Sequence, residues 1–190
     1  LDNTLVVMPE ADTQSERNPL KKQWYALVDV DPDRKRRKPE TPTDEIVEIY
    51  NRTGPRISET AKKMNAFISS LQKELKIKNK DTYVMGFSQG AMLAMYVGLT
   101  RKYELGGVFP FAGIVCGKDM LEKELASRPG VYLFHGTSDL SVQYKTLDFT
   151  KEWLDRHDID WEAIEYDGIE HRLIEDEMKD AAEIINRRSA

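Results

Sequence analysis

Two kinds of hydrophobic pattern alternate along the chain. From Ile57 to Leu75, apolar residues recur every three or four positions, which is typical of one face of an amphipathic helix. Short apolar runs at 83–87, 107–111 and 131–135 are too brief for a helix and favour buried strands. Residues 161–166 alternate between apolar and polar side chains, which also predicts a strand.

Helices are predicted between these strands. The segment Ala91–Leu99 is apolar nearly all round, so we expect a buried helix there, and further helices are expected at 118–127, 142–157 and 173–188. Short strands that alternate with longer helices indicate a mainly parallel sheet with helices on both faces. In such sheets ligands bind at the carboxyl ends of the strands, so functional residues are expected directly after each strand.

The first part of the chain is less regular. Thr4–Met8 is a β-branched run stopped by Pro9, which favours a buried strand. Residues 9–43 are rich in Pro, Asp, Asn and Arg and have no period, so we expect a long surface connection, which in compact domains is often functional. Within it, Trp24 and Tyr25 predict a segment that packs against the protein.

Composition limits the classes of protein. The 190 residues, 40% hydrophobic and 32% charged, suit a single domain, 1–190, with one core. A net charge of −5 argues against a nucleic-acid partner, and no apolar run approaches the ~20 residues that cross a bilayer. The lone Cys116 excludes an internal disulfide, and the 3 histidines lack zinc-site spacing, so we expect a cytoplasmic protein without a metal. The chain begins at Leu1 without Met or a signal peptide, so we expect it to be processed, cut or missing a front piece.

A serine stands between two glycines at the end of the predicted strand 83–87, in the motif Gly-Phe-Ser-Gln-Gly around Ser88. One interpretation is an ordinary turn of small residues. The other is a nucleophile elbow, in which the glycines prevent collisions in a tight turn and the serine hydroxyl is lifted above the sheet. The N–H of Gln89, at the start of the next helix, would then point toward the charge that forms on a substrate carbonyl oxygen.

Two further polar residues follow later strands. Asp139 either caps a helix or orients a histidine and stabilises its cation. His171 comes after the last predicted strand; a lone histidine is commonly a solvated surface residue, which is what we expect of His157. We expect His135 to be buried with its hydrogen bonds satisfied.

The order of the three candidates along the chain is informative. Ser88, Asp139 and His171 each follow a strand, and the α/β-hydrolase fold places its nucleophile, acid and base in that order. Three signals that are weak separately therefore predict, together, a Ser-His-Asp triad.

The blocks "GFSQGAML", "LFHGTSDLSV" and "YDGIEHRL" resemble the three catalytic blocks of the carboxylesterase/phospholipase branch of the α/β-hydrolases, which includes acyl-protein thioesterases. "VVMPEAD" and "WYALVDV" resemble its early strand and a stretch that borders the active site. The resemblance implies Ser88 as nucleophile, Asp139 as acid, His171 as base and the N–H of Gln89 as one oxyanion-hole donor. It implies no cofactor.

The sequence departs from that family in three places. No His-Gly-x-Gly-like block, which would carry a second oxyanion-hole donor, precedes Thr4. Either this chain lacks one or more N-terminal strands, which is the interpretation that we favour, or its oxyanion hole is incomplete. Glu170 stands where the family usually has Gly, and either raises the pKa of the base or points to solvent. Residues 31–56 form a charged insertion, which we expect to be a variant lid or rim.

The resemblance implies hydrolysis of a small-molecule or lipid acyl ester or thioester of short-to-medium chain length. Lysophospholipase, protein depalmitoylase and a non-catalytic hydrolase-like binding protein are the alternatives. We expect an apolar acyl pocket walled by Trp24, Phe87, Phe111 and Val142, each of which could instead be ordinary core. The basic run 34–38 is interpreted as a solvated loop rather than a contact for anionic headgroups. The family often forms homodimers, although no apolar stripe in the sequence demands one.

Overall fold

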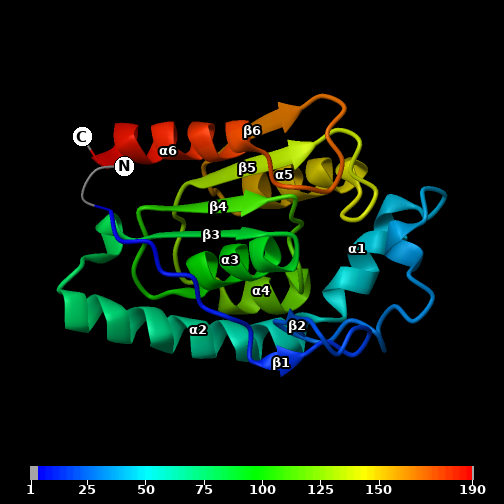
Figure 1. The fold of residues 1–190 in the computed structure, drawn as a ribbon, viewed down its shortest axis with the longest axis horizontal. Helices are drawn as coiled ribbons and strands as arrows, with labels where there is room; N and C mark the ends of the chain where they lie inside the picture. The colour runs from blue at the N-terminus through cyan, green and yellow to red at the C-terminus, as the bar shows by residue number, and fades with distance from the viewer. Residues whose placement is uncertain (1–3, 190) are drawn as a thin grey trace.

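The computed structural model describes residues 4–189, which fold around a four-stranded parallel sheet (Figure 1). The strands lie in the order β3-β4-β5-β6, and each pairs in parallel with the next one along the chain. They are Tyr83–Phe87 (β3), Gly107–Phe111 (β4), Val131–Gly136 (β5) and Trp161–Tyr166 (β6). The strands predicted from the apolar runs are thereby confirmed.

A helix lies between each pair of consecutive strands. The helices are α1 (Thr43–Asn51), α2 (Gly54–Leu75), α3 (Gln89–Thr100), α4 (Lys118–Glu124), α5 (Leu147–Arg156) and α6 (Glu175–Ser189). Two short antiparallel strands, β1 (Thr13–Gln14) and β2 (Lys22–Gln23), and the 3-10 turns η1 (Lys35–Arg37), η2 (Asn79–Asp81) and η3 (Tyr144–Thr146) complete the structure.

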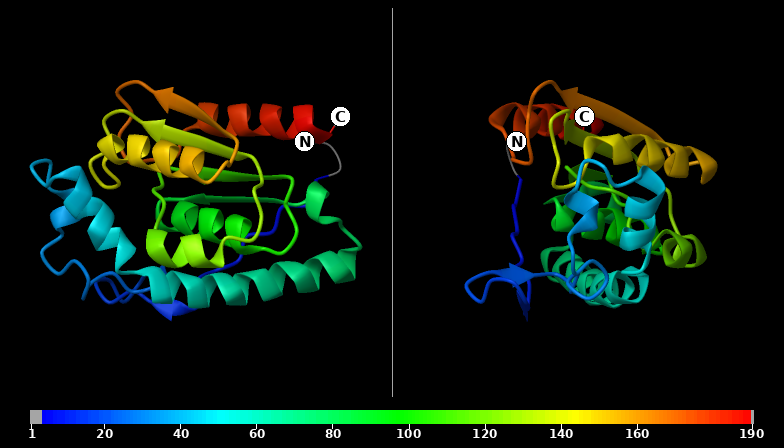
Figure 2. Two further views of the ribbon diagram at one scale, coloured as in Figure 1. Left: turned by 180° about the vertical axis from the view of Figure 1, so that it is seen from behind. Right: turned by 90° about the vertical axis from the view of Figure 1, so that its right-hand side faces the viewer.

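The sheet is covered on both faces, as predicted. Helices α2, α3, α4 and α5 pack on one face and form a large apolar cluster with it, whereas α6 packs on the other face against a smaller, aromatic cluster (Figures 1 and 2). Side chains that alternate along β4 separate into these clusters: Val108 belongs to the first, and Phe109 and Phe111 to the second. This two-sided burial explains why the strands read as continuous apolar runs.

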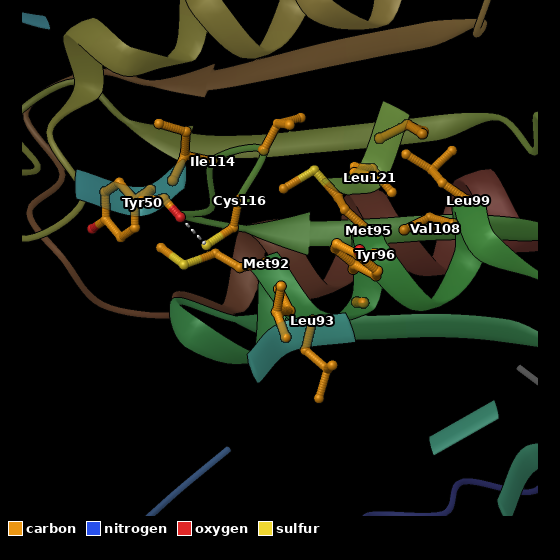
Figure 3. Close-up of a cluster of buried hydrophobic side chains, with 14 of the residues drawn as sticks. Tyr50, Met92, Leu93, Met95, Tyr96, Leu99, Val108, Ile114, Cys116 and Leu121 are labelled. Carbon is orange, nitrogen blue, oxygen red and sulfur yellow. Dashed lines mark hydrogen bonds between the residues drawn. The ribbon is translucent and has the colours of Figure 1, made fainter. Parts of the chain in front are cut away.

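Helix α3 is the centre of the larger cluster. Its residues from Ala91 to Leu99 are all buried, so the prediction of a buried helix is confirmed. Figure 3 shows side chains of α3 among those of β4, α4 and the segment before α4. Each fully buried large side chain contributes about 1.5–3 kcal/mol, so this cluster fixes the element that begins directly after Ser88.

The lone cysteine belongs to this core. The Sγ of Cys116 lies 3.4 Å from the carbonyl oxygen of Tyr50 and 2.8 Å from the hydroxyl of Thr53 (Figure 3). Burial raises the pKa of the Cys116 thiol to about 11, so the group is protonated at neutral pH and serves as packing rather than as a nucleophile.

The prediction of a buried strand at Thr4–Met8 is wrong. The segment has no ladder partner among the described residues, and Leu5, Val6, Val7 and Met8 are 60%, 67%, 45% and 88% exposed. A β-branched run becomes a strand only when a neighbouring strand satisfies its backbone, and β3, at the edge of the sheet, is not paired with this segment.

The early surface connection is more ordered than its composition indicated. It contains the β1–β2 hairpin, and Tyr25 is 3% exposed, which confirms that the Trp24-Tyr25 segment packs against the protein. Helix α1 was not predicted, although Ile46, Val47, Ile49 and Tyr50 are all buried and recur at helical spacing.

Candidate active site

Three loops at the carboxyl edge of the sheet bring Ser88, His171 and Asp139 together. The Nε2 of His171 lies 2.9 Å from the Oγ of Ser88, and its Nδ1 lies 2.7 Å from the Oδ2 of Asp139. These loops follow β3, β6 and β5, in the slots that the sequence indicated. The imidazole therefore bridges a hydroxyl and a carboxylate.

The turn that carries Ser88 is strained. Its φ of 56° and ψ of −116° lie in a region that a side chain disfavours, which costs about 1–3 kcal/mol. The Ser88 N–H donates to the carbonyl of Phe111 at 2.8 Å, which ties the turn to β4. A Cβ on Gly86 would lie 2.3 Å from the backbone of Gly90, so glycine is required at position 86.

The second glycine of the motif, Gly90, is under a weaker steric constraint. A Cβ on Gly90 would meet only the Nε1 of Trp24, at an ordinary 3.7 Å. The expectation that both glycines prevent collisions therefore holds for Gly86 alone. Trp24 lies over the start of α3, close to the turn that carries Ser88.

Asp139 is 1% exposed, and its buried carboxylate accepts several hydrogen bonds. Its Oδ1 accepts the N–H groups of Ser141 at 2.7 Å and Val142 at 3.1 Å. Burial by itself would raise the pKa of Asp139, but hydrogen bonds from His135 and His171 outweigh it and hold that pKa well below its ordinary value. The carboxylate is therefore charged at neutral pH and able to stabilise an imidazolium.

The loop that carries His171 approaches the end of β5 closely. The N–H of Ser138 donates to the carbonyl of Ile169 at 3.0 Å, and a Cβ on Gly136 would lie only 2.2 Å from that same oxygen. Glycine at position 136 thus lets the loop seat the imidazole above Asp139. The ring of Phe87 lies 4.6 Å from the His171 ring, centroid to centroid.

Glu170, directly before this histidine, is exposed. Its side chain makes no hydrogen bond or ion pair with any residue in the range 4–189. Of the two expectations for this carboxylate, the structure favours the one in which it points to solvent.

Gln89 has two separate groups at the site. As the first residue of α3 it presents a backbone N–H that has no intrahelical acceptor. Its side-chain Oε1 accepts the N–H of Trp24 at 2.9 Å, and its Nε2 donates to the carbonyl of Tyr25 at 2.8 Å. The motif indicated the first role, but no sequence signal indicated that the side chain anchors a distant loop.

The residues expected to wall the acyl pocket are separated in the structure. Trp24 lines a cavity of about 500 Å³. The other side chains at this cavity come from residues 9–13, from 25–26 and from one face of α2, including Met64 and Phe67. Phe87 instead contacts the imidazole of His171.

The other two expected pocket residues lie elsewhere. Phe111 is 2% exposed and stacks on Phe134 at 4.6 Å beneath α6, because it points to the opposite face of the sheet from Val108. Val142 is 3% exposed and belongs to the turn that holds Asp139. Neither lines the cavity.

The charged insertion 31–56 docks on the loop that carries the acid. Nε2 of Gln143 donates to the carbonyls of Arg36 at 2.9 Å and Lys38 at 2.8 Å, and Nζ of Lys145 donates to those of Pro39 and Thr41 at 2.9 and 2.6 Å. Figure 1 shows η1 and α1 at the carboxyl edge of the sheet.

The expectation that the basic run 34–38 is a solvated loop is wrong for Arg36 alone, because the other four residues of the run are exposed. Arg36 is 7% exposed and pairs with the buried Asp31, whereas Lys35 pairs with Glu45. The buried Arg36–Asp31 pair holds η1 in place, because a buried arginine without its carboxylate partner would be strongly destabilising. The Lys35–Glu45 pair is exposed and contributes little.

The site contains side chains for acid-base and nucleophilic chemistry. Within residues 4–189, no group of three or more His, Cys, Asp or Glu side chains is placed to hold a metal ion. No helix in that range is both long enough and apolar enough to span a bilayer.

Comparison with known proteins gives the chain a family. A family model described as Phospholipase/Carboxylesterase matches residues 1–189. The chain is 25% identical over 134 residues to acyl-protein thioesterase 1 of Saccharomyces cerevisiae, which covers 63% of this chain and 58% of the yeast protein. The chain thus spans less than two thirds of that relative's length.

Solved structures resemble the whole fold. The crystal structure of esterase PE8 superposes with a TM-score of 0.73 and 26% identity, covering 94% of this chain and 76% of that chain. Arabidopsis thaliana SOBER1 superposes with a TM-score of 0.73 and 20% identity, covering 96% of this chain and 81% of that chain. The chain belongs to the phospholipase/carboxylesterase family and has the α/β-hydrolase fold.

Proposed function

We propose that this protein is a serine hydrolase that cleaves carboxylic esters or thioesters through an acyl-enzyme. The observation that carries the proposal is the imidazole of His171, which contacts the Oγ of Ser88 at 2.9 Å and the carboxylate of Asp139 at 2.7 Å. A nucleophile within reach of a base that is itself oriented by an acid is the arrangement that acyl transfer needs.

The reaction proceeds in two steps. Nε2 of His171 accepts the proton of Ser88 as Oγ attacks the substrate carbonyl carbon, and Asp139 stabilises the imidazolium. The imidazolium then protonates the leaving alcohol or thiol, and the acyl group remains on Ser88. Water enters, loses a proton to His171 and attacks the acyl-enzyme. As the carboxylic acid is released, the imidazolium returns that proton to the Oγ of Ser88, which restores the serine and the base.

The oxyanion is held at the start of α3. The free backbone N–H of Gln89 and the positive end of this twelve-residue helix favour negative charge there. We assign no second donor; the family resemblance places it in a His-Gly-x-Gly-like block. One missing donor typically costs ~10²–10³ in rate, so the proposed chemistry is expected to be slow wherever that donor is absent.

We propose acyl chains of short to medium length. The cavity beside Trp24, about 500 Å³ in volume, is lined in part by apolar side chains, and Trp24 is the wall residue that lies at the start of α3. Lysophospholipids and palmitoylated proteins are alternative substrates on the same site. A series of p-nitrophenyl esters from acetate to palmitate, compared with a palmitoyl thioester and a lysophospholipid, ranks them by kcat/KM.

Several features outside the site are also part of the proposal. We propose that residues 1–190 form a single domain, in which the insertion 31–56 is a fixed rim rather than a moving lid, because Gln143 and Lys145 bind it to the acid loop. A cytoplasmic location and a homodimer stay predictions, which fractionation and sedimentation measurements test.

The nucleophile is tested by a pair of serine variants. Ser88→Ala is expected to abolish p-nitrophenyl butyrate turnover, whereas Ser138→Ala, at the same edge of the sheet, is expected to retain it. Ser138 is a matched control because, within residues 4–189, its backbone N–H bonds the Ile169 carbonyl at 3.0 Å and its hydroxyl has no partner. Turnover by Ser88→Ala at the wild-type rate would remove Ser88 from the mechanism.

A further inference from the structure

A second histidine lies against the acid of the proposed triad. His135 is 1% exposed, and its Nε2 lies 2.9 Å from the carbonyl oxygen of Val142 and 3.5 Å from the Oδ2 of Asp139. His171 approaches the same Oδ2 at 2.7 Å. Nitrogens of two imidazoles therefore approach the same oxygen of Asp139, and only the ring of His171 also contacts Ser88.

The contacts of His135 fix which nitrogen carries a proton. A carbonyl oxygen accepts hydrogen bonds, so Nε2 must be the N–H that donates to Val142. Nδ1 is buried and has no hydrogen-bond partner among the described residues. The sequence-based expectation of a fully satisfied His135 is thus wrong for one of its two nitrogens.

The bond to Val142 acts on the turn that holds the acid. The N–H of Val142 donates to the Oδ1 of Asp139 at 3.1 Å, while its carbonyl accepts from His135 at 2.9 Å. The peptide groups on both sides of Val142 are therefore held by hydrogen bonds, one to the carboxylate of Asp139 and one from the ring of His135. If the ring did not hold the carbonyl, that buried oxygen would be unpaired and the turn would rearrange to satisfy it.

We propose that His135 is a positioning residue for the acid of the triad: its Nε2–H clamps the Val142 carbonyl, borders the Asp139 carboxylate, and so keeps that carboxylate aligned with His171. The inference rests on the proposed function. His135 touches neither Ser88 nor the substrate, so it acts only through Asp139.

The electrostatic surroundings agree with this role. The Nε2–H of His135 donates to the Val142 carbonyl and also lies 3.5 Å from the Oδ2 of Asp139. Burial would raise the pKa of Asp139, but this neighbouring N–H and the hydrogen bond from His171 lower it, which keeps the carboxylate charged. The other titratable groups near His135 are Glu165 on β6, Glu177 on α6 and Tyr144, whose ring lies 6.0 Å away. Burial raises the pKa of Glu177, whereas the ion pair with Lys151 lowers that of Glu165, and Asp139 is the carboxylate that lies 3.5 Å from Nε2 of His135.

Substitutions of equal polarity separate positioning from packing. His135→Gln places its amide nitrogen the same number of bonds from Cα as Nε2, so it can still donate to Val142. His135→Asn is shorter and reaches only the position of Nδ1, and His135→Leu has no donor. His157→Leu is the matched control, because that ring also bonds a carbonyl, of Trp153 at 2.7 Å, far from the acid.

The proposal is tested by measuring kcat and KM of these variants with p-nitrophenyl butyrate. We expect kcat to fall about 10- to 100-fold in His135→Asn and His135→Leu with KM unchanged, since the loss is confined to the transition state. His135→Gln is expected to stay within about threefold of the wild type, as is His157→Leu. The Gln and Asn pair, both polar, decides the matter if the leucine variant does not fold.

Two results would overturn the proposal while leaving the triad intact. One is wild-type kcat in a folded His135→Asn protein. The other is an equal loss in the Gln and Asn variants, which would show that the ring's shape matters and its hydrogen bond does not. Failure of the proposed function itself gives a different result, namely turnover that survives in Ser88→Ala.

Discussion

The side-chain Oε1 of Gln89 accepts the backbone N–H of Trp24 at 2.9 Å, although the two residues are 65 positions apart. With the bond from Nε2 to the carbonyl of Tyr25, one side chain ties the early loop to the first turn of α3. The residue whose backbone N–H we propose as an oxyanion-hole donor thus also fixes the tryptophan that lines the cavity.

Replacing Gln89 with Ala is expected to affect substrate length more than basic chemistry. The variant keeps its backbone N–H but loses two hydrogen bonds, each worth about 1 kcal/mol, so the Trp24 segment loosens. We expect kcat/KM to fall about tenfold for p-nitrophenyl octanoate and less than threefold for the acetate. Gln72→Ala, which removes hydrogen bonds to Asn79 and Thr82, is the control. Equal losses on both esters would contradict the account.

The two motif glycines are expected to differ in their tolerance of a methyl group. Gly86→Ala forces a Cβ to within 2.3 Å of the Gly90 backbone, which cannot move freely, so we expect unfolding free energy to drop by about 3 kcal/mol. Gly90→Ala meets an ordinary 3.7 Å contact with Trp24 and is expected to stay within about 1 kcal/mol of the wild type. Urea unfolding of both variants measures the difference, and equal stability would refute the steric argument.

Changing Asp139 to Asn tests the role of the acid in turnover. The amide cannot stabilise an imidazolium and favours the wrong tautomer of His171, so kcat is expected to fall by about 10⁴. The control is Asp167→Asn at the same edge, whose carboxylate accepts a hydrogen bond from the hydroxyl of Thr137 at 3.2 Å and from no other side chain in the described part of the protein. A loss of less than tenfold in Asp139→Asn would mean that Asp139 does not serve as the acid.

The wild type and Asp139→Asn are also expected to differ in how their stability depends on pH. The folded-state pKa of Asp139 is depressed, so its charge stabilises the fold above the ordinary aspartate value of about 3.9, and that contribution is lost as the pH falls through the folded pKa. Compared with Asp139→Asn, the wild type should therefore lose its advantage as the pH falls below about 4. Thermal melts at pH 7 and pH 3 measure it; a difference independent of pH would contradict the hydrogen-bonding argument.

The central part of the fold was predictable from local sequence because buried strands and helices require apolar residues at recognisable spacings. The strands β3 to β5 are covered on both faces, so they appear as apolar runs between turn residues. Ser88, Asp139 and His171 could be found because parallel strands end at one edge, which converts chain order into proximity. Their catalytic roles stay predictions.

The predictions failed where the local structure depends on residues that are distant in the sequence. Thr4–Met8 has strand-like composition, but a strand exists only with a neighbour, which a local pattern does not specify. Phe111 was assigned to the pocket although it points to the face under α6, since the face depends on register in the sheet. The Gln89 side chain and the contacts of His135 also depend on partners brought close only by folding.

The central claim is that Ser88 is an activated nucleophile, and covalent labelling tests it most directly. A fluorophosphonate probe is expected to add one phosphonyl group to the wild-type protein, located at Ser88 by peptide mass analysis, because only an activated serine reacts. Labelling should be absent in Ser88→Ala and unchanged in Ser138→Ala. No labelling of the folded wild-type protein, or a label on another serine, would contradict the account.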